Sequence, residues 1–106
     1  MDHQLRSEAV RHQVRLRLDT LRAQSYAQLS ERPPWSTEII PFGNTKAELI
    51  TYCEREQSDR LTIVVQFVPE GGVDGVVWHG VYAEGFWITA EGRILPLPDA
   101  QRFGFM

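Results

Sequence analysis

The sequence predicts an α+β fold in which one long amino-terminal helix packs on a curved antiparallel sheet of four to six strands. Residues 7–29 contain no Gly or Pro and consist mostly of good helix formers, until Ser30 and the Pro33-Pro34 pair end the run. The following segments are short, rich in Ile, Val, Phe, Trp and Thr, and separated by turn residues, as in an antiparallel meander. A helix and a meander bury both apolar faces if the sheet curls around the helix.

The composition is typical of one globular domain. The chain has 106 residues, of which 42% are hydrophobic and 24% charged, so we expect a single domain over 1–106. No apolar run approaches the ~18 residues of a membrane-spanning helix. The first residues carry charge throughout, unlike a secretory signal, and Cys53 is the single cysteine. We therefore expect a cytoplasmic protein without a membrane association or an internal disulfide.

The charge is unevenly distributed along the chain. Residues 1–32 hold six arginines and four acids, a net charge of +2, whereas residues 33–106 hold five basic and ten acidic groups, a net charge of −5. Nucleic-acid binding requires clustered Lys and Arg on one face. An acidic body therefore argues against a nucleic-acid partner.

The strands are expected in a meander over about 38–97, before an apolar tail at 98–106. Their predicted ranges are 38–42, 47–54, 61–68, 76–82, 86–90 and 93–97, with turns expected at 43–44, 57–59, 69–75 and 91–92. Gly80 and Gly85 indicate a bend or bulge between two of these strands.

The predicted helix has two apolar stripes. The broader stripe, which we expect to face the sheet, consists of Val10, Val14, Leu18, Leu21 and Leu29. The thinner stripe, rich in alanine, would allow another surface to approach closely; it consists of Leu5, Ala9, Leu16, Ala23 and Ala27. The arginines between the stripes are expected to form a solvated face with Glu8 and Asp19 at helical spacing.

The later strands are apolar on both faces. In 61–68, Val64 and Val68 oppose the face that carries Ile63 and Val65, and Trp87 opposes Phe86 in a later strand. A sheet with one solvated face should alternate apolar and polar residues. We therefore expect a homodimer through the outer face of these strands. The predicted interface residues are Val64, Val68, Val77, Val81, Trp87, Phe103 and Phe105.

A second set of residues is predicted to bind a small apolar or aromatic ligand between helix and sheet. The set consists of Tyr52, Trp78, His79, Tyr82, Glu84 and Trp87. His79 with a nearby carboxylate could act as a general base, but a place in a packed wall or interface is the more common role of such a residue. No nucleophile signature, calcium loop or zinc spacing is present, so we assign no catalytic residue, metal or cofactor.

The predicted order of elements is similar to the cystatin and monellin architecture and to small relatives of the nuclear-transport-factor fold. The stretch Gln66-Phe67-Val68-Pro69-Glu70-Gly71 resembles the cystatin motif Gln-x-Val-x-Gly, except that its glycine comes one position late. Pro34-Trp35 matches a second cystatin hallmark but precedes the sheet. The resemblance is one of topology, and it does not transfer protease inhibition.

These patterns favour a small soluble interaction or accessory domain that self-associates or binds another protein. The alternative is a domain that binds a small apolar ligand, and an enzyme that uses His79 is the least favoured reading.

Overall fold

A computed structural model of the chain describes residues 3–43, 45–57, 59–69 and 82–97, and for 3–7, 45, 56, 57 and 69 the backbone alone. Two helices precede five strands, which form one antiparallel sheet in the order β1-β2-β3-β4-β5. The elements are α1 (His3–Arg22), α2 (Tyr26–Ser30), β1 (Trp35–Phe42), β2 (Thr45–Gln57), β3 (Arg60–Pro69), β4 (Tyr82–Thr89) and β5 (Ile94–Pro96). The predicted α+β class with an antiparallel sheet is confirmed.

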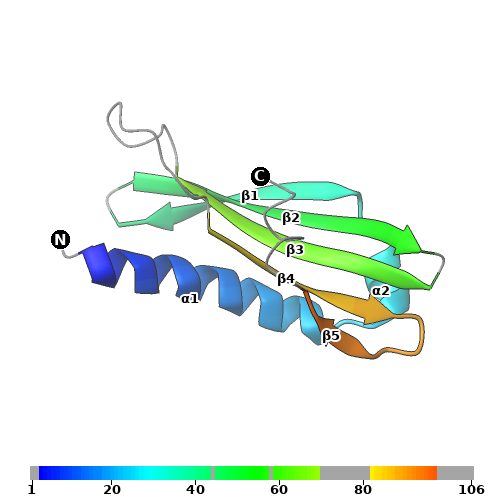
Figure 1. Cartoon of the computed structure of the whole chain (residues 1–106). Helices are drawn as coiled ribbons and strands as arrows, with labels where there is room; N and C mark the ends of the chain where they lie inside the picture. The colour runs from blue at the N-terminus through cyan, green and yellow to red at the C-terminus, as the bar shows by residue number, and fades with distance from the viewer. Residues whose placement is uncertain (1–2, 44, 58, 70–81, 98–106) are drawn as a thin grey trace.

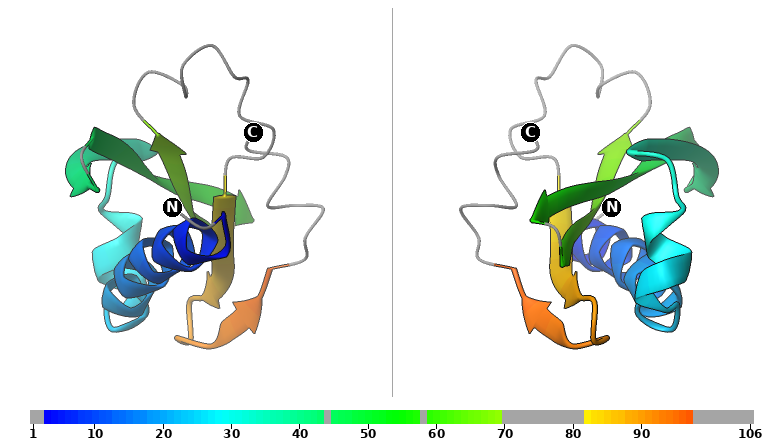
Figure 2. Two further views of the ribbon diagram at one scale, coloured as in Figure 1. Left: turned by 90° about the vertical axis from the view of Figure 1, so that its left-hand side faces the viewer. Right: turned by 90° about the vertical axis from the view of Figure 1, so that its right-hand side faces the viewer.

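The molecule has two layers. Helix α1 runs along one face of the twisted sheet, and α2 lies beyond its carboxyl end (Figure 1, Figure 2). We call the sheet face that packs against α1 the inner face and the opposite one the outer face. Within the part of the chain that is described, neither helix has the length and apolar character needed to cross a membrane.

The prediction of one long helix over 7–29 is wrong. Helix α1 ends at Arg22, and a second helix, α2, begins after Ser25. The Ser25 hydroxyl accepts a hydrogen bond from the Gln28 amide over 3.1 Å, and the Gln28 side chain accepts one from the Ser25 amide over 2.9 Å. This capping box favours a new helix start, because it satisfies amide groups that would otherwise lack partners. The pattern Ser-x-x-Gln was visible in the sequence.

The core lies between α1 and the inner face. As predicted, the broader stripe of the amino-terminal segment is buried against the sheet. The buried hydrophobic residues of this core are Val10, Val14, Leu18, Leu21, Leu29, Ala47, Leu49, Cys53, Leu61, Ile63, Val65, Phe67, Phe86 and Ile88. In the thinner stripe, Ala9, Leu16, Ala23 and Ala27 are all exposed, so this stripe points away from the sheet.

Three of the predicted turns connect the strands as expected. Gly43, with φ of 61°, lies between β1 and β2, and Gly92, with φ of 88°, lies between β4 and β5. Glycine suits these positions because other residues rarely adopt a positive φ. The third turn joins Gln57 of β2 to Arg60 of β3.

Gly85 does not separate two strands, contrary to the prediction. Strand β4 runs without interruption through Gly85, which pairs with Val64 of β3. A Cβ atom at this position would lie 2.2 Å from the Ile63 carbonyl oxygen. Glycine therefore allows a close approach of two strands here. The predicted strand over 76–82 lies outside the described residues except for Tyr82, which begins β4.

Cys53 lies on the inner face of β2 and is buried, as expected for a small apolar side chain. Its thiol donates a hydrogen bond to the Leu29 carbonyl over 3.1 Å. Burial raises the pKa of this thiol above its usual value, while the nearby cations Arg32 and Arg55 lower it to a smaller extent. The neutral thiol thus helps to hold α2 against β2.

Candidate functional site

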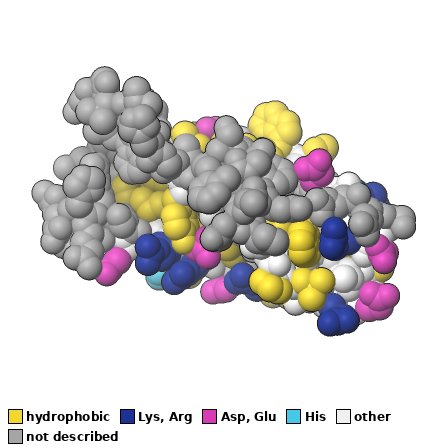
Figure 3. All heavy atoms as spheres, viewed as in Figure 1, with side chains coloured by type: hydrophobic (Ala, Val, Ile, Leu, Met, Phe, Trp, Pro, Cys, Tyr) yellow, Lys and Arg dark blue, Asp and Glu magenta, His cyan; other side chains and the backbone are white. Residues whose placement is uncertain are grey.

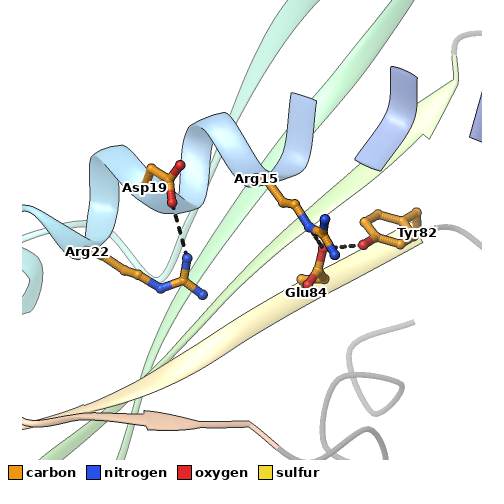
Figure 4. A network of polar contacts seen from close by, with 5 residues as sticks. All are labelled: Arg15, Asp19, Arg22, Tyr82 and Glu84. Atoms are coloured by element: carbon orange, nitrogen blue, oxygen red, sulfur yellow. Dashed lines mark hydrogen bonds and ion pairs between the residues drawn. The ribbon is translucent and has the colours of Figure 1, made fainter. Parts of the chain in front are cut away.

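Three polar side chains join α1 to the inner face of β4. Arg15 contacts Glu84 with 3.3 Å between Nε and Oε2, and the Tyr82 hydroxyl donates a hydrogen bond to the same carboxylate oxygen (Figure 4). The Arg11 guanidinium lies 5.9 Å from the centre of the Tyr82 ring. Burial raises the pKa of Tyr82 to about 12, with further contributions from the hydrogen bond to Glu84 and from its negative charge.

This cluster anchors α1 to the sheet. Tyr82 holds its proton at neutral pH, because its pKa is high, and Glu84 is already bound by two donors. The prediction of a solvated arginine face is thus only partly right. Arg22 binds Asp19 within the helix at 3.3 Å, whereas Arg15 reaches across to the sheet (Figure 4).

On its opposite side, α1 binds the edge strand β1 through an ion pair. Arg17 forms an ion pair with Glu38 on the inner face of β1. Nearby, Arg32 donates a hydrogen bond to the Ser36 hydroxyl over 3.3 Å. Partial burial lowers the pKa of Arg17 from its usual value, and the neighbouring Arg32 cation adds to this effect. Two cations therefore share the inner side of β1 with one carboxylate.

The outer face is buried over β3, although no described helix covers it. Val64 has no exposed surface, Thr62 is 1% exposed and Gln66 is 5% exposed. The two polar side chains have partners on neighbouring strands: Trp87 Nε1 donates to the Thr62 hydroxyl over 3.1 Å, and the Tyr52 hydroxyl donates to Gln66 over 3.1 Å. Buried polar groups are costly without such partners. This part of the outer face is therefore a second, smaller packed layer.

Leu97 and Arg60 extend this outer layer. Leu97 is buried, and its Cδ2 atom comes within 3.0 Å of the place that a Cβ atom of residue 85 would occupy. The Arg60 guanidinium lies 4.2 Å from the centre of the Trp87 ring, a cation–π distance. The layer thus contains Leu97, which follows β5, as well as side chains of the strands.

The structure does not bring the predicted ligand-binding residues together. Tyr82 and Glu84 lie on the inner face of β4, whereas Tyr52 and Trp87 lie on the outer face, as their register with Val64 and Thr62 requires. Trp78 and His79 lie outside the described residues. The four described members therefore cannot line one pocket between the helix and the sheet.

The three predicted interface residues that the structure describes offer little open surface. Val64 is fully buried within the single chain, and Val68 and Trp87 are half-buried. The other four predictions, Val77, Val81, Phe103 and Phe105, lie outside the described residues.

Among the described residues, the large apolar side chains with the greatest exposure lie on β1. Trp35 and Ile39 are each 61% exposed, and both lie on the outer face, in register with Tyr52 and Glu48 of β2. In the view of Figure 3, hydrophobic side chains project at the upper edge of the molecule, where β1 runs in Figure 1. The sequence prediction began its first strand at residue 38 and so did not place Trp35 on a strand. The alternation of Trp35, Thr37 and Ile39 on one face was the available signal.

A groove of about 400 Å³ lies between the helices and the β4–β5 hairpin. Arg22 and Tyr26 border it on the helical side, and Ile88 and Ile94 border it on the side of the sheet. Ile94 is 42% exposed. The groove combines apolar walls with a few polar groups and is partly open to solvent.

Among residues 3–43, 45–57, 59–69 and 82–97, no group of three His, Cys, Asp or Glu side chains converges as a metal site requires. Comparison with protein-family models, with curated proteins and with solved structures finds no match to this chain.

Proposed function

We propose that the protein is a small interaction domain that self-associates. The observation that supports this is the pair of large apolar side chains, Trp35 and Ile39, that the single chain leaves 61% exposed on one face of an edge strand. The surface that we propose is therefore the outer face of β1, rather than that of the later strands. Sheet residues that remain this exposed are a favourable contact surface for another protein.

The energetics favour a partner that covers both side chains. Full burial of one large apolar side chain contributes roughly 1.5–3 kcal/mol, and Trp residues often dominate interfaces. A second copy of the chain presents the same pair, and two-fold dimers are the most common closed assemblies. Self-association is thus the simplest way to cover Trp35 and Ile39.

Light scattering after size exclusion tests this proposal. At micromolar concentration we expect the parent chain to have the mass of a dimer, and the double variant Trp35→Ser, Ile39→Thr to have the mass of a monomer. Leu16→Gln is the matched control, because Leu16 is 50% exposed but lies on the helix. It should leave the dimer intact. A monomeric parent chain would refute the proposal.

A second candidate function is the binding of a small apolar or aromatic ligand. The groove beside Tyr26, Ile88 and Ile94 favours it, since an aromatic ring and two branched aliphatic side chains suit such a ligand. In a thermal-shift screen of small aromatic compounds, a stabilising compound should lose its effect on Ala27→Trp, which fills the groove from α2. An equal shift for the variant and the parent chain would rule out this groove.

The finer architecture and the location complete the proposal. A helix followed by an antiparallel meander supports a cystatin-like arrangement. A buried, reduced Cys53 fits the cytoplasm, where thiols stay reduced. Microscopy of a fluorescent fusion tests this location.

A further inference from the structure

Strand β1 is an edge strand. Within the described sheet it pairs with β2 alone, and the strand at the other edge, β5, has only three residues. A long exposed edge presents unpaired backbone groups to which another strand can add. The question is therefore which groups of β1 point to this edge.

One hydrogen bond fixes the direction of these groups. The Cys53 amide donates to the Pro34 carbonyl over 2.9 Å, so residues 34 and 53 form a hydrogen-bonded pair of the antiparallel ladder. Such pairs alternate along the strands with pairs that do not bond to each other. The backbone groups of residues 34, 36, 38, 40 and 42 therefore point to β2. Those of Trp35, Thr37, Ile39 and Pro41 point to the open edge.

The position of Pro41 agrees with this assignment. Proline has no amide hydrogen, and it is tolerated in a sheet where its nitrogen faces away from the neighbouring strand. Pro41 is one of the residues whose backbone nitrogen points to the open edge. It leaves Trp35, Thr37 and Ile39 as the residues that offer both a donor and an acceptor there.

We propose that two copies pair through β1 in a two-fold antiparallel arrangement centred on Thr37, which joins their sheets into one. This rests on the proposed self-association and names its geometry. In this register Thr37 faces the partner's Thr37, and Trp35 faces the partner's Ile39 in two equivalent pairs. Three pairs that each exchange two bonds give roughly six interchain hydrogen bonds.

The side chains favour this register on both faces. On the outer face it places the exposed Trp35 directly opposite the exposed Ile39 of the second copy, and aromatic–β-branched pairs of this kind stabilise sheets. Because the arrangement is symmetric, two such pairs form. Each pair covers one Trp35 and one Ile39 side chain that the single chain leaves exposed.

Charge complementarity supports the register on the inner face. Glu38 is opposite the partner's Ser36, whose hydroxyl accepts a hydrogen bond from that copy's own Arg32. Each Glu38 thus approaches one arginine of the second copy in addition to its own Arg17. Glu38 is the only charged residue of β1, so no like charges oppose each other across the junction.

Cysteine cross-linking reads the register directly. In the proposed pairing, residue 36 and the partner's residue 38 have Cα atoms about 4.5 Å apart, within the range that a disulfide spans. An equimolar mixture of Ser36→Cys and Glu38→Cys chains should form a disulfide-linked heterodimer under mild oxidation, with up to about half of the chains cross-linked because half of randomly mixed dimers are mixed. Peptide mapping identifies the bond and separates it from any bond of the buried Cys53.

Each variant alone is the matched control. Two copies of residue 36, or of residue 38, are offset by two positions in this register, roughly 7 Å along the strand, and should stay unlinked. Linkage of Ser36→Cys alone would place the centre at residue 36, and linkage of Glu38→Cys alone would place it at residue 38; either result overturns the register. If light scattering shows a dimer but none of the three samples cross-links, pairing through β1 is wrong while self-association stands. A monomer refutes both.

Discussion

The outer face of the sheet differs between its two halves. Over β3, Val64 is fully buried and Thr62 and Gln66 nearly so, whereas over β1 the side chains of Trp35 and Ile39 are 61% exposed. On this face both strands alternate apolar side chains with threonine or glutamine. The difference shows that a two-sided apolar pattern has two separate causes: packing within the chain, and a surface left for a partner.

The covered half depends on side chains from elsewhere in the sequence. Leu97 reaches the space beside Gly85, Trp87 bonds to Thr62, and Tyr52 bonds to Gln66. No described residue plays the same role for Trp35 or Ile39. Changes in the covered half should therefore reduce stability, and changes in the open half should reduce association.

The largest effect is expected from Gly85→Ala. The new methyl group would lie 2.2 Å from the Ile63 carbonyl oxygen and 3.0 Å from atoms of Val64 and Leu97, so β4 must move away from β3. Overpacking of this kind costs about 3 kcal/mol. Urea denaturation measures the loss. Gly43→Ala is the control, since it meets no atom within 4 Å and costs only the strain of its positive φ, about 1 kcal/mol. Equal losses in both variants would contradict the close packing at Gly85.

An intermediate effect is expected from matched substitutions, one in each half, whose losses in the free energy of unfolding can be compared directly. Val64→Thr buries a hydroxyl in the covered half and should lower the free energy of unfolding by about 2 kcal/mol. Ile39→Thr, the same kind of change in the open half, should alter it by less than about 0.5 kcal/mol. Both are measured by denaturation at a concentration where the chain is monomeric. Similar values for the two variants would remove the distinction between the halves.

The smallest effect is expected from Tyr82, which lies on the inner face of β4. The pKa of Tyr82 is raised from 10.0 to about 12 in the folded chain, so the folded state holds this proton where the unfolded state has lost it. Stability should therefore be unaffected by Tyr82 below pH 10 and fall between pH 10 and about 12. Tyr82→Phe should flatten this fall in thermal melts, and Glu84→Gln should move it to lower pH. A fall of the same size in Tyr82→Phe would show that Tyr82 is not its source.

Much of the fold could be predicted from local patterns. The stripe of Val10, Val14 and Leu18 predicted the buried side of α1, and glycine at 43 and 92 predicted two turns, because these signals depend on neighbours in the sequence. The break after Arg22 was also encoded locally, in the Ser25–Gln28 capping box, but a run of helix formers concealed it.

The candidate site could be predicted much less well. Tyr82, Glu84, Tyr52 and Trp87 were grouped by residue type, yet strand register places two of them on each face. Gly85 was taken for a bend, since sequence alone does not show that a neighbouring carbonyl leaves no room for a side chain.

By itself, the sequence determined the fold class, the stripe of α1 that is buried and the apolar character of both sheet faces, because each follows from the periodicity of one element. Only the tertiary structure decided that the face of β3 is filled while that of β1 is open, and that Arg15 and Arg17 bind the sheet rather than the helix. These facts depend on residues far apart in the sequence meeting in space, and no local pattern specifies such a meeting.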